Sequence, residues 1–171
     1  NPAKKWYEVA LIFNVISSLG TFALAYMMAT KNLHQNWYLA AVYFFLHFQY
    51  NGWFFFASMG LASAKFLPAV PIPVQKNIFW LFAGACIPAY VLSALWLPIP
   101  FWAYLVVVLA AFSQLAGWLL TIQQIKKQWT YIHSVAAAGI TRIMLLVCIA
   151  VSIKLALQLG STIPSLSTLA F

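Results

Sequence analysis

The chain has 171 residues, of which 65% are hydrophobic, 18% aromatic and only 6% charged, with a formal net charge of +8. Soluble domains carry about 25% charged residues, so this composition cannot cover a water-facing surface and predicts an integral membrane protein. Glu8 is the only acidic residue. Its isolation excludes two-carboxylate catalysis within the chain, a carboxylate metal cage and an acidic proton relay.

Apolar blocks long enough to cross a membrane recur along the chain, since a spanning α-helix needs about 20 mostly apolar residues. Between the second and third of these blocks, three prolines prevent a regular helix: Pro68, Pro71 and Pro73. We expect an all-α fold, with residues 1–171 forming a single transmembrane helical domain. Because the chain begins at Asn1 and ends at Phe171 in an apolar run, we expect a piece of a longer protein. The five expected membrane-spanning helices are, in chain order, about 6–29, 37–62, 78–97, 101–122 and 137–159.

Basic residues are distributed unequally between the two expected membrane faces. The face with fewer basic residues has Lys31, with Lys154 close to its edge. Arg142 lies near the face that carries more of them. The positive-inside rule therefore places the N-terminus in the cytoplasm. Charge spread between apolar blocks in this way reflects membrane topology, so we do not expect nucleic-acid binding. The richer side carries Lys4, Lys5, Lys65, Lys76, Lys126 and Lys127.

The stretch YFFLHFQYNGWFFF at 43–56 places three hydrogen-bonding side chains near mid-depth of the second expected span. The three side chains are those of His47, Gln49 and Asn51. Residues three and four apart share a helix face, so His47 and Asn51 lie on one face and Gln49 points away from it. The first span offers a matching polar line, and Gly20 beside it allows a neighbouring helix to approach closely. The stripe on the second span comprises Tyr43, His47, Tyr50, Asn51 and Ser58, and the line on the first comprises Asn14, Ser17, Ser18 and Thr21.

Two interpretations of His47 remain open. In one, the polar side chains join helices by hydrogen bonds, each contributing about 0.6 kcal/mol and at most about 2 kcal/mol. In the other, His47 is the axial ligand of a buried cofactor, haem iron more readily than copper. An imidazole at mid-depth needs a partner for both nitrogens. Asn51 or Tyr43, each one helical turn away, would orient the nitrogen that is not bound to metal.

Two basic residues lie inside the last expected span. A lysine or arginine held at mid-depth costs about 2.5–3.5 kcal/mol. Arg142 and Lys154 each lie about five residues from a span end, so we expect both to extend toward the membrane surface. The alternative is that one of them neutralises an acidic cofactor group such as a haem propionate, and on this interpretation Arg142 belongs to the cofactor site.

Other features of the spans favour packing roles. Ser113 and Gln114 precede Gly117 and Trp118 in the fourth span, a polar-then-small pattern typical of helix contacts. Pro88 is expected to bend the third span. Cys86 and Cys148 lie inside apolar runs, where we expect small buried side chains. His34 and His133 fall in connections, where solvated imidazoles are expected.

The motif HFQYNGWFFF at 47–56 resembles a helix motif of known membrane-protein families. A membrane-embedded His47 five residues before the pair Gly52-Trp53 is similar to the histidine-plus-Gly-Trp helices of the haem–copper oxidase catalytic-subunit superfamily and of NnrS-type proteins of the nitric-oxide response. The run at 37–61 resembles uncharacterised multi-span proteins of Bacteroidetes-like bacteria, labelled oxidase subunit I-like. The resemblance implies helices that present histidines to haem or copper in a multi-pass protein of the bacterial cytoplasmic (inner) membrane. Only His47 matches such a position, so catalysis by this chain alone is not expected.

These observations predict a membrane-embedded haem- or copper-binding subunit, or part of one, related to respiratory oxidases or nitric-oxide handling proteins. Its metal ligand would be His47, with Tyr43, Asn51 and Arg142 in the cofactor site. The alternative is a non-catalytic structural subunit that scaffolds a larger membrane complex. A transporter or channel is less favoured, because mid-membrane acids usually mark such pathways. In each case the expected partners are the lipid bilayer and other transmembrane helices.

Overall fold

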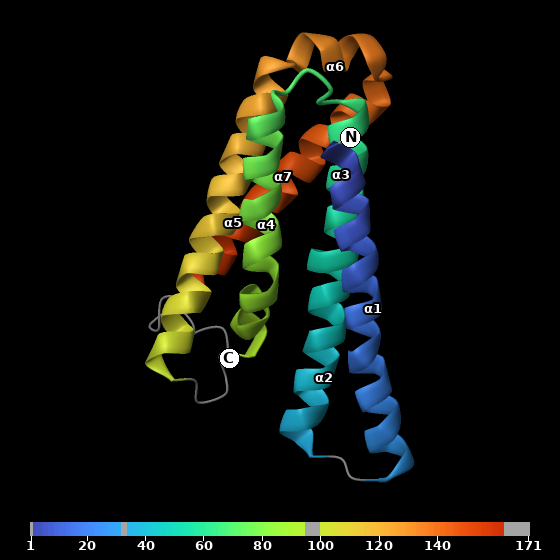
Figure 1. Ribbon diagram of the computed structural model, residues 1–171, viewed down its shortest axis with the longest axis vertical. Helices are drawn as coiled ribbons and strands as arrows, with labels where there is room; N and C mark the ends of the chain where they lie inside the picture. The colour runs from blue at the N-terminus through green and yellow to red at the C-terminus, as the bar shows by residue number, and fades with distance from the viewer. Residues whose placement is uncertain (1, 32–33, 95–99, 163–171) are drawn as a thin grey trace.

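The computed structural model describes residues 2–31, 34–94 and 100–162, and every regular element within them is a helix (Figure 1). The all-α prediction is confirmed for this part of the chain. In order, the elements are α1 Pro2–Ala29, α2 Gln35–His47, the π-helix η1 Phe48–Phe54, α3 Phe55–Lys65, α4 Ile72–Ala89, the 3₁₀-helix η2 Tyr90–Ala94, α5 Phe101–Lys127, α6 Trp129–Val135 and α7 Ala138–Gly160.

Four helical stretches within the described residues are long and apolar enough to cross a membrane. They correspond to the first, third, fourth and fifth expected spans, although the end of the third, residues 95–97, lies outside the described part. The second expected span, 37–62, differs because it is divided into α2, η1 and α3, which follow one another directly. The four stretches are Ala3–Ala29, Ile72–Ser93, Phe101–Lys127 and Ala138–Gly160.

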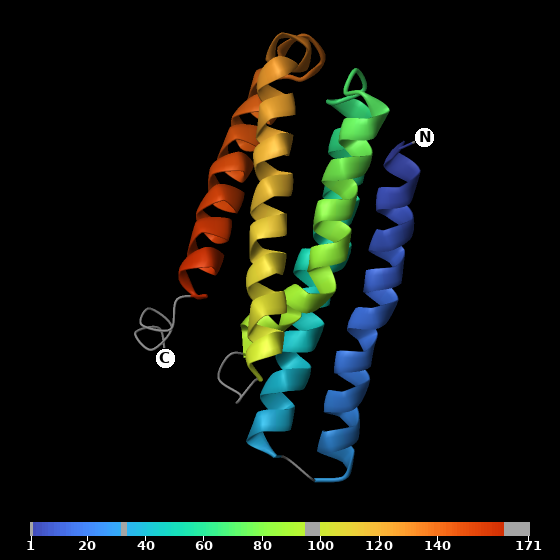
Figure 2. The ribbon, with the colours of Figure 1, turned by 60° about the vertical axis from the view of Figure 1, so that its left-hand side comes forward.

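α1 packs along α2, η1 and α3, with glycines at the points of closest approach (Figures 1 and 2). A Cβ at Gly20 would lie 2.8 Å from a backbone oxygen of α2. One at Gly52 would lie 2.7 Å from Cβ of Phe13, and one at Gly60 would lie 2.9 Å from a ring carbon of Tyr7. Non-bonded carbon atoms prefer about 3.5–4.0 Å, so glycine is required for this spacing, as expected at Gly20.

η1 determines how α3 is rotated relative to α2. The N–H of Phe55 reaches the carbonyl of Tyr50, five residues earlier, which is the spacing of a π-turn. Gly52 and Gly60 are eight residues apart, and a regular α-helix would rotate by about 80° beyond two full turns over that length. The extra residue taken up by the π-turn removes about 100° of rotation. Both glycines therefore face α1.

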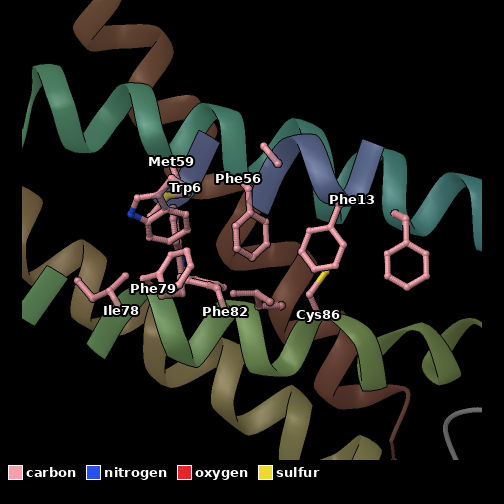
Figure 3. Packing of buried hydrophobic residues seen from close by; sticks show 12 residues of the cluster. Trp6, Phe13, Phe56, Met59, Ile78, Phe79, Phe82 and Cys86 are labelled. Carbon is pink, nitrogen blue, oxygen red and sulfur yellow. The ribbon is translucent and has the colours of Figure 1, made fainter. Parts of the chain in front are cut away.

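The core lies between α1 and α3 on one side and α4 on the other, and aromatic rings fill most of it (Figure 3). The Trp6 ring lies 5.3 Å from that of Phe56 and 5.1 Å from that of Phe79, measured between centroids. Phe13 stacks on Phe48 at 5.6 Å. Offset and edge-on aromatic pairs of this kind contribute about 0.5–1.5 kcal/mol beyond their buried area. The aromatic run of the second expected span thus packs partly inward.

α4 and α5 form an antiparallel pair (Figure 2). The hydroxyl of Ser113 on α5 donates to the backbone carbonyl of Leu81 on α4 at 2.8 Å, so a side-chain hydrogen bond joins the two helices. A Cβ at Gly117 would lie 3.0 Å from the Phe82 ring, which again marks a close approach. The packing roles expected for Ser113 and Gly117 are confirmed.

α7 lies at the edge of the bundle and packs chiefly against α5. Two side-chain hydrogen bonds join these helices: Trp118 Nε1 donates to Ser152 Oγ at 2.9 Å, and Gln158 Nε2 donates to Gln114 Oε1 at 2.8 Å. Much of α7 is nevertheless exposed, since only Thr141 and Leu155 of this helix are buried. An apolar, largely uncovered helix of this kind is suited to contact with lipid or with another helix.

Candidate functional site

His47 lies at the junction of α2 and η1, near the middle of the helical stretch Gln35–Lys65. Its side chain is 6% exposed and points inward toward α4. The Tyr90 ring of η2 packs edge-on against the imidazole, with 5.9 Å between centroids, and the Phe48 ring lies at 5.1 Å. The imidazole is therefore enclosed by aromatic rings, where each polar atom needs a partner.

Both ring nitrogens of His47 have hydrogen-bond partners. Nε2 lies 2.8 Å from the carbonyl oxygen of Cys86. A carbonyl only accepts, so Nε2 carries the proton and donates it. Nδ1 is then an acceptor, and the side-chain amide of Asn51 donates to it at 3.3 Å. The network thus assigns the neutral imidazole with its proton on Nε2.

The Cys86 carbonyl is able to accept from His47 because α4 changes its hydrogen bonding at this point. In a regular α-helix that carbonyl would accept from the N–H of Tyr90, four residues later. The Tyr90 N–H is directed to the carbonyl of Ile87, because α4 tightens into the 3₁₀-helix η2 just after Pro88. The irregularity expected at Pro88 therefore leaves a backbone acceptor facing His47.

Asn51 extends the hydrogen bonds to α7. Its Oδ1 accepts a hydrogen bond from Nζ of Lys154, 103 residues later in the chain. Lys154 thus bonds to an amide oxygen on η1, and its expected extension toward the membrane surface stays a prediction. Sequence reasoning considered Lys154 beside Arg142 as a partner of an acidic cofactor group, but it assigned only Arg142 to the site and missed the bond from Lys154 to Asn51. The available signal was a lysine six residues before the end of an apolar helix, in a chain with a single carboxylate.

Two other expected site residues do not join His47. Tyr43 is half-buried, and among the described residues none forms a hydrogen bond with its hydroxyl. Tyr90 occupies the position beside the imidazole instead, and its hydroxyl donates to a backbone carbonyl of α2 at 3.0 Å. Arg142 is exposed near the start of α7, twelve residues before Lys154, or about 18 Å along the helix axis.

The polar line on α1 does not face the stripe that contains His47. The hydroxyl of Ser17 donates to Gln49 Oε1 at 2.8 Å, whereas Ser18 and Thr21 are exposed and donate to carbonyls of their own helix. The predicted pairing was wrong because close approach of α1 depends on the face that carries Gly52, and Gln49 shares that face. His47 is left on the side that faces α4.

The arrangement of side chains bears on the predicted metal site. Among the described residues, no group of three His, Cys, Asp or Glu side chains is placed to hold a metal ion. His34 and His133 are both exposed, His34 in the connection before α2 as expected and His133 within the short helix α6. Because each nitrogen of His47 already has a partner, the ring as placed offers no free position to iron or copper. A metal would have to replace either the bond to the Cys86 carbonyl or the bond to the Asn51 amide.

Comparisons with protein-family models, curated proteins and solved structures find no match to the chain. The resemblance of the second expected span to oxidase-type helices therefore remains a hypothesis that rests on its short motif. In this structure the glycine of that motif has a packing role, because Gly52 admits the side chain of Phe13. The motif can thus be explained by helix contact alone.

Proposed function

We propose that the chain is a non-catalytic transmembrane unit of a larger membrane assembly, in which the His47 network fixes the arrangement of the helices. The observation that carries this proposal is the use of both imidazole nitrogens in contacts between helices. One nitrogen joins α2 to α4, and the other leads through Asn51 to Lys154 on α7. Of the two interpretations of the sequence, this is the structural alternative.

The network favours one helix arrangement more than it adds stability. Hydrogen bonds between helices in a membrane contribute only about 0.6 kcal/mol on average. Removing one partner is more costly, because a buried donor or acceptor left alone costs about 1–3 kcal/mol. An arrangement that misaligns α4 or α7 would leave His47 or Asn51 unpaired, so the network penalises incorrect packing.

The proposed unit crosses a bacterial inner membrane five times, with its N-terminus in the cytoplasm. α2, η1 and α3 contain 13, 7 and 11 residues, and together measure about 46 Å at the usual helical rise. This length exceeds the hydrocarbon thickness of about 30 Å. The start of α1, the end of α3, the start of α4 and the end of α5 lie at one end of the bundle (Figure 1). Each of these segments carries basic residues, which supports a cytoplasmic assignment for that end.

The substitution His47→Ala tests the structural proposal. We expect it to lower the free energy of unfolding by about 1–3 kcal/mol, because the Cys86 carbonyl and the Asn51 amide lose their partner. The measurement is thermal unfolding of the purified protein in one fixed detergent, together with absorption spectra of oxidised and reduced samples. The matched control is His133→Ala, which removes an exposed imidazole that packs on the Trp129 ring. Unchanged stability of the His47→Ala protein would contradict the proposal.

The second candidate function is a haem- or copper-binding subunit related to respiratory oxidases or nitric-oxide handling proteins, with His47 as axial ligand. The observation that favours it is a buried imidazole among aromatic rings, which suit a planar cofactor. The same samples distinguish the two functions. A Soret band that disappears in His47→Ala and persists in His133→Ala would replace the structural proposal with this one.

A further inference from the structure

Lys154 has a positive charge that no acidic side chain of this chain balances. The only carboxylate side chain, that of Glu8, lies 3.6 Å from Lys4 near the start of α1. The Lys154 ammonium bonds to Asn51, a neutral amide. A lysine near the centre of a bilayer costs about 2.5–3.5 kcal/mol, and polar groups placed there are functional by default. The missing counter-charge points to an anionic ligand.

A cavity of about 290 Å³ lies beside this ammonium, between η1, α3, α4 and α7. Its inner wall includes Phe56 and Leu155, which are 1% and 3% exposed. Its outer rim includes Tyr50 and Phe54, which are 63% and 60% exposed and therefore face the surrounding lipid. The volume is near the lower end of the range of about 300–1,000 Å³ for small-molecule sites. A ligand can thus enter from the bilayer and reach Lys154.

A second cavity of about 130 Å³ continues the first between α3 and α7. This part includes Met59, Trp118 and Met144 in its wall. Met144 lies ten residues before Lys154, or about 15 Å along α7. Together the cavities form an elongated groove with an ammonium at one end and apolar side chains at the other. The two cavities share four lining residues: Phe55, Ser58, Val147 and Val151.

We propose that this groove binds a long-chain carboxylic acid, with the carboxylate on Lys154 and the alkyl chain extended toward Met144. A small inorganic anion does not fit, because apolar walls cannot replace its hydration. A phospholipid is also unsuited, because its head group stays at the membrane surface, whereas Asn51 lies near the middle of Gln35–Lys65. A carboxylic acid becomes neutral on protonation and can reach this depth through the hydrocarbon region.

The affinity comes mainly from the charged end of the ligand. Lipid tails are as apolar as the groove, so an alkyl chain gains little by moving from the bilayer into the protein. The pair formed by a carboxylate and the ammonium is different, because it is surrounded by a medium that screens charge weakly. An acid and an alcohol of equal chain length are therefore expected to bind with very different affinities.

The experiment uses palmitate labelled with ¹³C at its carboxyl carbon and the protein in phosphatidylcholine nanodiscs, with empty nanodiscs as the reference. We expect a separate carboxyl resonance that saturates at one palmitate per chain and that hexadecanol does not displace. Lys154→Met keeps the length of the side chain without its charge and is expected to weaken palmitate binding at least tenfold. Lys154→Arg keeps the charge and is expected to retain binding.

Two further variants complete the test. Lys31→Met removes an exposed lysine just beyond α1 and is expected to leave palmitate affinity unchanged. Ala62→Trp fills the apolar end of the groove and is expected to weaken palmitate more than the shorter decanoate. If Lys154→Met does not fold, the comparison of palmitate with hexadecanol and the chain-length effect of Ala62→Trp still test whether the groove binds a carboxylic acid.

Several results would overturn the proposal. One is equal palmitate affinity in the natural chain and in folded Lys154→Met, and another is displacement of palmitate by hexadecanol. A third is the absence of any protein-dependent resonance, which would leave the acidic side chain of another membrane helix as the partner of Lys154. None of these results bears on the role of His47, which is tested by stability and absorption spectra of different variants.

Discussion

Gly52 and Gly84 are both glycines inside helical segments, and their surroundings differ completely. At Gly52 an added Cβ would lie 2.7 Å from Cβ of Phe13, whereas at Gly84 nothing lies within 4 Å. The two positions share the intrinsic cost of glycine in a helix, which is about 1 kcal/mol relative to alanine. They therefore form a matched pair that separates helix propensity from helix contact.

We expect Gly52→Ala to destabilise the protein by about 1–3 kcal/mol, because α1 must move away or Phe13 must leave its preferred rotamer. Gly84→Ala is expected to be neutral or to stabilise by up to about 1 kcal/mol. The measurement is the unfolding of both proteins in the same detergent. Equal stabilities of the two variants would mean that the close contact between α1 and η1 does not form.

Some residues of the site could be identified from the sequence and others could not. His47 and Asn51 are polar, four residues apart and set in an apolar span, so local spacing was enough to relate them. Lys154 lies 103 residues from Asn51, and its inward direction depends on how α7 crosses η1. Pro88 indicates the helix irregularity that frees the Cys86 carbonyl, but the packing that turns this carbonyl toward His47 has no signal in the sequence.

η1 is the element that relates the two halves of the second expected span. The residue of α2 nearest Gly20 is Ala41, and Gly52 lies eleven residues later, which is about 20° beyond three turns of α-helix. Gly60 lies eight residues after Gly52 and needs the π-turn to reach the same face. The π-turn is therefore required only for the C-terminal half of the contact with α1.

Deletions of single residues test this geometry. Without Phe54, Gly52 and Gly60 would be seven residues apart, about 20° short of two turns in a regular α-helix, so we expect the bundle to form. Without Leu46, Ala41 and Gly52 would be ten residues apart, about 80° short of three turns, so we expect loss of the α1 contact. Both deleted side chains are exposed, at 60% and 37%.

The measurement for these deletions is the thermal midpoint and the monodispersity of the solubilised proteins. We expect the Phe54 deletion to remain close to the natural protein and the Leu46 deletion to unfold at a clearly lower temperature. Two deletions that are equally damaging would contradict the role assigned to η1.

At the scale of elements, hydropathy predicted most of the helices. The spans 6–29, 101–122 and 137–159 coincide with α1, α5 and α7 to within a few residues, because length and apolar composition alone determine whether a segment can cross a membrane. The π-helix could not be predicted in the same way. It brings Gly52 and Gly60 to the same face toward α1. An average over apolar residues contains no information about rotation within a helix.

The distribution of basic residues describes the molecule as a whole. The starts of α1 and α4 lie at one end of the bundle, and the end of α1 lies at the other (Figure 1). Lys5 and Lys76 belong to the first two segments, and Lys31 follows α1. The stretch Gln35–Lys65 therefore runs from one end of the bundle to the other, and the five-pass proposal has it cross the membrane. The five-pass proposal can therefore be tested by the accessibility of three positions.

We expect Lys76→Cys and Lys5→Cys to react with a membrane-impermeant maleimide only from the cytoplasmic face, and Lys31→Cys only from the opposite face. The background carries Cys86→Ala and Cys148→Ala, so that each protein has a single thiol. The measurement is labelling of intact cells against inverted membrane vesicles. Reaction of Lys31→Cys and Lys76→Cys from the same face would mean that Gln35–Lys65 does not cross.

The hydrogen bond between Lys154 and Asn51 has a consequence for biosynthesis. At a translation rate of about 5–20 residues per second, the 103 residues that separate these partners take about 5–20 s to appear. If the stretch Gln35–Lys65 spans the bilayer as proposed, it holds Asn51 there for that time, before α7 exists. Either the translocon shields this amide until release, or the early hairpin with α1 must be stable enough to wait for the last helix.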